Sequence, residues 1–107
     1  MIAMLAELRI PGQPDPVREI LEVFAVDGER GLSILGEAFA SNDSDGLRRA
    51  AHRLKGAAAN VGAVELATLL ARVEDGARGG HLEVLDGDLR RAAHLFRDSL
   101  TALEALA

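Results

Sequence analysis

The sequence predicts an all-α protein, an antiparallel four-helix bundle with a short additional N-terminal helix or segment. Hydrophobic residues make up 49% of the 107 residues, yet only 3% are aromatic. This composition favours packed helices over a β-sandwich, because strands usually draw on β-branched and aromatic residues. Apolar residues also recur at helical spacings in several segments. Short polar turns join these segments, which indicates antiparallel neighbours.

The length is typical of one domain with a single hydrophobic core. We therefore treat residues 1–107 as one domain, in which residues 1–14 are an N-terminal segment and residues 15–106 form the helical bundle. Residues 1–10 could form a short helix before three prolines interrupt the backbone. This stretch has the wrong length and flanks for a signal peptide or a membrane span, so we expect a soluble, cytoplasmic protein.

The first half of the bundle contains two helical patterns. Asp15 precedes a proline, as an N-cap residue often does, and opens a helix over about 15–26. An Asp-Gly pair ending at Gly28 is a turn or kink signal, after which a second helical pattern covers 29–40. Residues 15–26 are therefore either a separate packing helix or the first half of a helix kinked at Gly28.

The second half contains three further helices. A polar break with several candidate N-caps precedes a central helix at 46–60, and Gly62 fits a helix terminator. Leucines at helical spacing predict the next helix at 63–77, which stops at a Gly-Gly pair. The last and longest helix is expected over 81–106.

The central helix exposes a histidine. At about 100° per residue its apolar side chains gather on one side, whereas His52 falls nearly opposite them and should face water. Its neighbours at helical spacing form a basic surround with two minimal side chains. They are Arg48, Arg49, Lys55, Gly56 and Ala59.

The residue types around His52 suit phosphoryl transfer. A neutral imidazole can attack phosphorus with one ring nitrogen while the other makes an orienting hydrogen bond, so His52 is the predicted phosphoryl acceptor. Lys55 is the leading candidate for stabilising the negative charge of the moving group. Arg48 and Arg49 could support that charge or attract an acidic partner. Together with Ala59 they form the predicted partner surface.

Gly56 and Glu74 complete the candidate site. A larger side chain at Gly56, four residues after the histidine, would stand beside the acceptor and could block in-line approach. Glu74 lies at the edge of the apolar face of the following helix, and an antiparallel hairpin could bring it near His52. There its carboxylate could orient the imidazole and raise its basicity.

The stretch Ala-His-Arg-Leu-Lys-Gly at 51–56, with Asn-Val-Gly ending at Gly62, resembles the signature of histidine-containing phosphotransfer (HPt) domains. The similarity covers approximately residues 15–106. It implies a single-domain phosphorelay protein, a phosphocarrier rather than an enzyme, which moves a phosphoryl group between receiver-domain aspartates. Implied partners are response-regulator receiver domains and the receiver domain of a hybrid histidine kinase. The receiver would supply Mg²⁺ and most of the catalytic groups.

Other functions find less support in the sequence. The chain has no Gly-x-x-x-x-Gly-Lys-Ser/Thr loop for ATP, no cysteine, and three widely separated histidines, so we expect no cofactor and no metal site of its own. His81 and His94 are expected to be ordinary surface residues. A net charge of −5 gives little support to nucleic-acid binding. A monomer is the simplest carrier.

Two alternatives remain open on the sequence alone. One is an adaptor bundle that binds a receiver or kinase but no longer transfers phosphate. The other is a structural four-helix oligomer, since apolar helix faces can also form coiled-coil interfaces.

Overall fold

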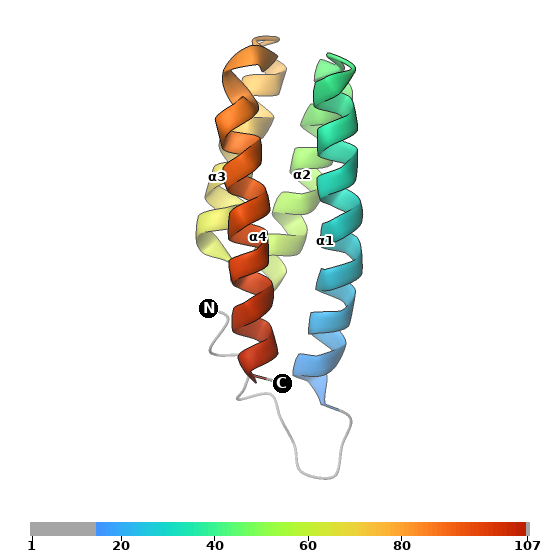
Figure 1. The fold of residues 1–107 in the computed structure, drawn as a ribbon, viewed down its shortest axis with the longest axis vertical. Helices are drawn as coiled ribbons and strands as arrows, with labels where there is room; N and C mark the ends of the chain where they lie inside the picture. The colour runs from blue at the N-terminus through green and yellow to red at the C-terminus, as the bar shows by residue number, and fades with distance from the viewer. Residues whose placement is uncertain (1–14, 107) are drawn as a thin grey trace.

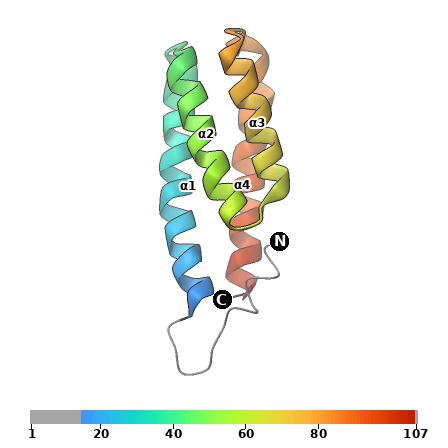
Figure 2. The ribbon, with the colours of Figure 1, turned by 180° about the vertical axis from the view of Figure 1, so that it is seen from behind.

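The computed structural model describes residues 15–106, which form a bundle of four antiparallel α-helices (Figures 1 and 2). The predicted all-α bundle is confirmed. The short helix expected within residues 1–10 lies outside the described residues. The elements are α1 (Pro16–Ala40), α2 (Ser44–Asn60), α3 (Val64–Arg78), the 3₁₀ turn η2 (Leu82–Leu85) and α4 (Asp86–Leu106).

The helices pack as a closed ring. Each helix contacts its neighbours in the chain, and α1 also packs against α4. The contact between α2 and α3 is the most extensive. Helices α1 and α4 extend beyond the turn that joins α2 to α3, so the α2–α3 hairpin lies against the upper part of a longer α1–α4 pair (Figures 1 and 2). None of the helices within the described residues is long and apolar enough to cross a membrane.

Helix α1 is continuous from Pro16 to Ala40, so the turn that would have made residues 15–26 a separate packing helix is absent. Gly28 is buried inside α1, where a Cβ atom would overlap the ring of Phe96 from α4. Phe24, one turn earlier, packs on the same ring with the centroids 5.0 Å apart. The glycine therefore permits close packing of α1 against α4 rather than a turn. Residues 16–26 are therefore the first part of one long helix, as in the second alternative, whose kink at Gly28 stays a prediction.

The predicted helix caps are present. The Asp15 carboxylate accepts a hydrogen bond from the Val17 backbone N–H at 3.0 Å, and Asp43 accepts one from Gly46 N–H at 2.9 Å. After α2, Gly62 has a positive φ of 73°, and its N–H donates to the Ala59 carbonyl at 3.0 Å. This left-handed residue ends α2 and turns the chain back along it.

The end of the chain differs slightly from the expectation. Instead of one helix from residue 81, the chain forms η2 and then begins α4 at Asp86. Leu82 and Leu85 of η2 are both buried, so this short turn closes one end of the core. The core itself draws on all four helices. Its largest fully buried side chains include Phe96, Leu35, Leu47, Leu66, Leu70 and Leu103.

Candidate functional site

His52 lies on the outer face of α2, as the helical pattern predicts. The opposite face of α2 is buried and includes Leu47, Ala51, Leu54 and Ala58. Because these residues fix the rotation of the helix, the His52 side chain faces outward and is 66% exposed. A partner can therefore reach the imidazole without any rearrangement of the bundle.

Glu74 of α3 is the residue that holds the histidine. The antiparallel hairpin brings Glu74 Oε1 to 2.9 Å from His52 Nδ1, although the two residues are 22 positions apart. Glu74 Oε2 accepts a hydrogen bond from Lys55 Nζ at 2.6 Å. Glu74 is only 6% exposed, and it is the one buried charged residue within the described part of the chain. Both carboxylate oxygens therefore bind groups of the candidate site.

The charge of Glu74 determines which nitrogen of the neutral histidine ring carries the proton. The hydrogen bond from Lys55 lowers the pKa of Glu74 below its usual value of 4.5, with further lowering by the His52 hydrogen bond, although burial acts in the opposite direction. At neutral pH the carboxylate is thus ionised and can only accept hydrogen bonds. Nδ1 of His52 must then be the protonated nitrogen. In the neutral ring the free lone pair lies on Nε2.

Gly56 leaves open space beside His52. It is exposed, and a Cβ atom at this position would find no atom within 4 Å. A side chain here would therefore project into solvent on the histidine face rather than clash with the protein itself. Ala59 is also exposed, and Ala57, which is half-buried, offers no hydroxyl.

Two arginines of the basic surround of His52 are held in ion pairs within α2. Arg48 and Arg49 both pair with Asp45, at 3.0 Å and 3.2 Å. The hydrogen bond from Arg48 and the charge of Arg49 lower the pKa of Asp45. Asp45 lies in the first turn of α2. Its spacing of three and four residues from the two arginines was the signal that would have revealed the pairs.

Arg78 also belongs to the site and was not predicted. It follows Glu74 by one helical turn on α3, and its Nη2 lies 3.8 Å from Glu74 Oε1. Its Nη1 donates to Asp75 Oδ1 at 3.2 Å. The i, i+4 spacing from Glu74 was the available sequence signal. Glu74 therefore faces three cationic or potentially cationic side chains, from His52, Lys55 and Arg78.

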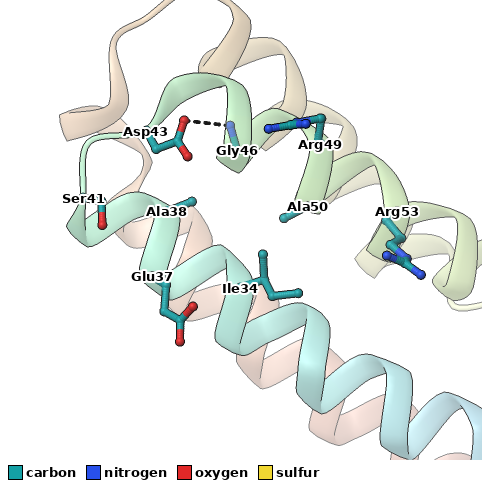
Figure 3. A pocket seen from close by; sticks show the side chains of 9 residues that line it. All are labelled: Ile34, Glu37, Ala38, Ser41, Asp43, Gly46, Arg49, Ala50 and Arg53. Atoms are coloured by element: carbon teal, nitrogen blue, oxygen red, sulfur yellow. Dashed lines mark hydrogen bonds between the residues drawn. The ribbon is translucent and has the colours of Figure 1, made fainter.

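A groove runs between α1 and α2 on the other flank of the histidine helix (Figure 3). Its volume is about 550 Å³ near the α1–α2 turn, with Ile34 pointing into it and Arg53 reaching across from α2. Within residues 15–106, Arg53 has no ion-pair partner. Ile34 and Arg53 also line a second hollow of about 320 Å³ that reaches Gly56. A third, of about 390 Å³, continues past the exposed Val23.

The described residues contain no group of three or more His, Asp or Glu side chains placed to hold a metal ion. The two other histidines lie outside the site, since His81 precedes η2 and His94 is exposed on α4.

Comparison with known proteins gives one match. The family model of the Hpt domain matches residues 19–106. No curated protein and no solved structure shows a significant match to the chain. Hpt domains are helical bundles that act as phosphocarriers in phosphorelays and interact with receiver domains. The helical bundle, the outward-facing histidine on its second helix and the match over nearly the whole chain lead to one conclusion: this chain belongs to the Hpt domain family.

Proposed function

We propose that this protein carries a phosphoryl group on Nε2 of His52 and passes it between the aspartates of receiver domains. The main support is the hydrogen bond of 2.9 Å between His52 Nδ1 and the buried carboxylate of Glu74. This contact leaves the nucleophilic lone pair on the exposed side of a fixed ring. Without this hydrogen bond, the proton of the neutral, solvent-exposed ring could lie on either nitrogen.

The transfer step follows from this arrangement. Nε2 attacks the phosphorus of a receiver aspartyl phosphate, the N–P bond forms, and the bond from phosphorus to the aspartate oxygen breaks, which regenerates the receiver carboxylate. The imidazole gains positive charge as its lone pair is used, while the proton on Nδ1 stays directed at Glu74. The negative charge of Glu74 therefore stabilises the ring most when the N–P bond is forming.

Lys55 and Gly56 have separate roles in this proposal. Lys55 is partly exposed, at 32%, and carries a positive charge within reach of the site. It can neutralise charge on the phosphoryl oxygens, and a cation at that place favours the transition state. Gly56 leaves room for the receiver to bring its aspartate in line with Nε2.

We propose that the receiver docks over the outer face of α2 and into the α1–α2 groove. The groove offers the apolar side chain of Ile34 beside Arg53, which has no ion-pair partner in the described part of the chain. A receiver presents a cluster of acidic groups around its phosphorylated aspartate and supplies Mg²⁺, which screens the phosphoryl oxygens. Arg48, Arg49 and Ala59 extend the surface along α2. Receivers of response regulators and of a hybrid histidine kinase are the proposed partners.

The test uses a panel of purified receiver domains phosphorylated with acetyl phosphate. Each is mixed with the wild-type protein, and acid-labile, alkali-stable phosphate on the protein is followed over time. We expect at least one receiver to phosphorylate the wild type and His94→Gln, and none to phosphorylate His52→Gln. Equal labelling of His52→Gln would contradict the proposal. Binding of receivers without any labelling of the wild type would indicate the adaptor alternative.

A further inference from the structure

Lys55 already forms an ion pair with Glu74 before any phosphoryl group is bound. Its Nζ lies 2.6 Å from Glu74 Oε2, on the carboxylate that also binds Nδ1 of His52. The phosphoryl group, however, bonds to Nε2 on the other edge of the ring. Lys55 must therefore loosen its contact with Glu74 in order to neutralise the phosphoryl oxygens.

Loosening that contact has a cost. Glu74 is buried, and a buried carboxylate that loses its counter-ion is strongly destabilised unless another positive group replaces the lost one. The hydrogen bond from His52 satisfies Oε1 but leaves Oε2 without a donor once Lys55 turns away. A second cation close to Glu74 would remove this cost.

Arg78 is placed to be that cation. Its Nη2 lies 3.8 Å from Glu74 Oε1, which is too long for a hydrogen bond, and a rotation of the side chain would bring the guanidinium onto the carboxylate and its freed Oε2. Its side chain is 61% exposed, and its Nη1 donates a hydrogen bond to the exposed Asp75 at 3.2 Å. Among the described residues, only His52, Lys55 and Arg78 bring a basic nitrogen within 4.0 Å of Glu74.

We infer that Arg78 is a positioning residue that takes over Glu74 as counter-ion when Lys55 turns to the phosphoryl group on His52. This inference rests on the proposed function of His52. The exchange makes and breaks no covalent bond: Lys55 leaves Oε2, the Arg78 guanidinium closes on the carboxylate, and Glu74 stays ionised and bonded to Nδ1. After transfer to the next receiver, Lys55 returns and Arg78 moves back to Asp75.

The exchange predicts that the effects of substituting Lys55 and Arg78 on the transfer rate depend on each other. In the protein that retains Arg78, the substitution Lys55→Met removes a cation that acts on the phosphoryl group. We expect it to slow transfer about tenfold. In Arg78→Gln, Lys55 stays on Glu74 and contributes little. We expect Arg78→Gln alone to slow transfer about threefold to fivefold, and Lys55→Met to add less than about twofold in that background.

A double-mutant cycle tests this coupling with transfer rates from a phosphorylated receiver. Arg78→Lys keeps a positive charge one turn after Glu74 and should restore most of the rate. Arg72→Gln removes the same charge from the same helix, where Arg72 is 69% exposed and lies near Asp88 instead, and should leave the rate unchanged. Helical circular dichroism and thermal unfolding check that each variant folds.

The outcomes separate the two proposals. Multiplicative effects of Lys55→Met and Arg78→Gln, or a rate in Arg78→Lys as low as in Arg78→Gln, would overturn the counter-ion exchange while leaving His52 as the carrier. Absence of phosphate from the wild type with every receiver would overturn both. Coupling with rescue by Arg78→Lys would support the exchange.

Discussion

The two flanks of α2 differ in what they hold. On the flank toward α3, a buried carboxylate binds His52 and Lys55 through hydrogen bonds of 2.9 Å and 2.6 Å. On the flank toward α1, Ile34 is 39% exposed and Arg53 has no ion-pair partner within the described residues. The first flank is satisfied internally, whereas the groups of the second have no such partners among residues 15–106. We infer that the α3 flank sets the reactivity of the histidine and the α1 flank sets the choice of partner.

The largest effect should come from the α3 flank. Glu74→Ala removes the acceptor that keeps the proton on Nδ1, so we expect phosphoryl transfer to fall on the order of 10²-fold. Glu74→Gln keeps an acceptor oxygen without the charge and should lose less. Transfer rates from a saturating phosphorylated receiver measure both. If Glu74→Ala changed only the receiver concentration at half-maximal rate, the two flanks would not divide as we infer.

A smaller effect is expected at Gly56, which lies between the two flanks. Gly56→Gln should slow transfer about tenfold by obstructing the receiver. It should also raise the free energy of unfolding by roughly 0.5–1 kcal/mol, since an exposed helical glycine is replaced by a better helix former. Gly36→Gln is the matched control, because this exposed glycine of α1 likewise has no atom within 4 Å of a Cβ. It should gain stability without a change in transfer, and equal slowing of both variants would contradict the steric account.

A substitution on the α1 flank should have a weaker effect, on receiver binding rather than on the maximal rate. Arg53→Gln is expected to raise the receiver concentration at half-maximal rate about twofold to fivefold, with the maximal rate unchanged. The difference from the wild type should shrink at high salt because the lost contact is electrostatic. Arg97→Gln, an exposed change on α4, is the control. A lower maximal rate for Arg53→Gln at saturating receiver would place Arg53 with the chemistry instead.

The smallest expected effect is on the free energy of unfolding at acidic pH. The folded pKa of Glu74 is lowered, so the stability that its ionised form contributes is complete above the ordinary value of 4.5 and is lost as the pH falls through the folded pKa. The stability difference between the wild type and Glu74→Gln should therefore narrow below pH 4.5. Urea unfolding at a series of pH values measures it. A constant difference down to pH 3 would mean that the folded pKa of Glu74 is not lowered by its partners.

The sequence predicted features that depend on one helix. The exposure of His52 follows from the periodicity of α2, and the caps at Asp15 and Asp43 follow from local chemistry. The four-helix bundle and the Hpt family were likewise predicted and confirmed. These features need no knowledge of how the helices rotate against one another.

Features that depend on contacts between helices were harder to predict. The Asp-Gly pair at Gly28 indicated a turn or kink. The packing of the Phe96 ring against this glycine, which is the reason for it, can be seen only in the folded bundle. The proximity of Glu74 to His52 was anticipated as an option of the hairpin, but the bond to Lys55 was not. Arg78 was overlooked because its role depends on where Glu74 points. In each case the missing information was the rotation and register of one helix against another.

The turn at Gly62 has a consequence for how such proteins diversify. Because it folds α3 directly back on α2, every side chain of the proposed chemistry, from His52 to Arg78, lies within one continuous hairpin. Helix α1, which forms the opposite wall of the groove, contributes none of them. In the proposed docking mode, substitutions on α1 would therefore change the choice of receiver without altering the proposed phosphoryl acceptor. Under this proposal, the α2–α3 hairpin would preserve the reaction while α1 evolves specificity.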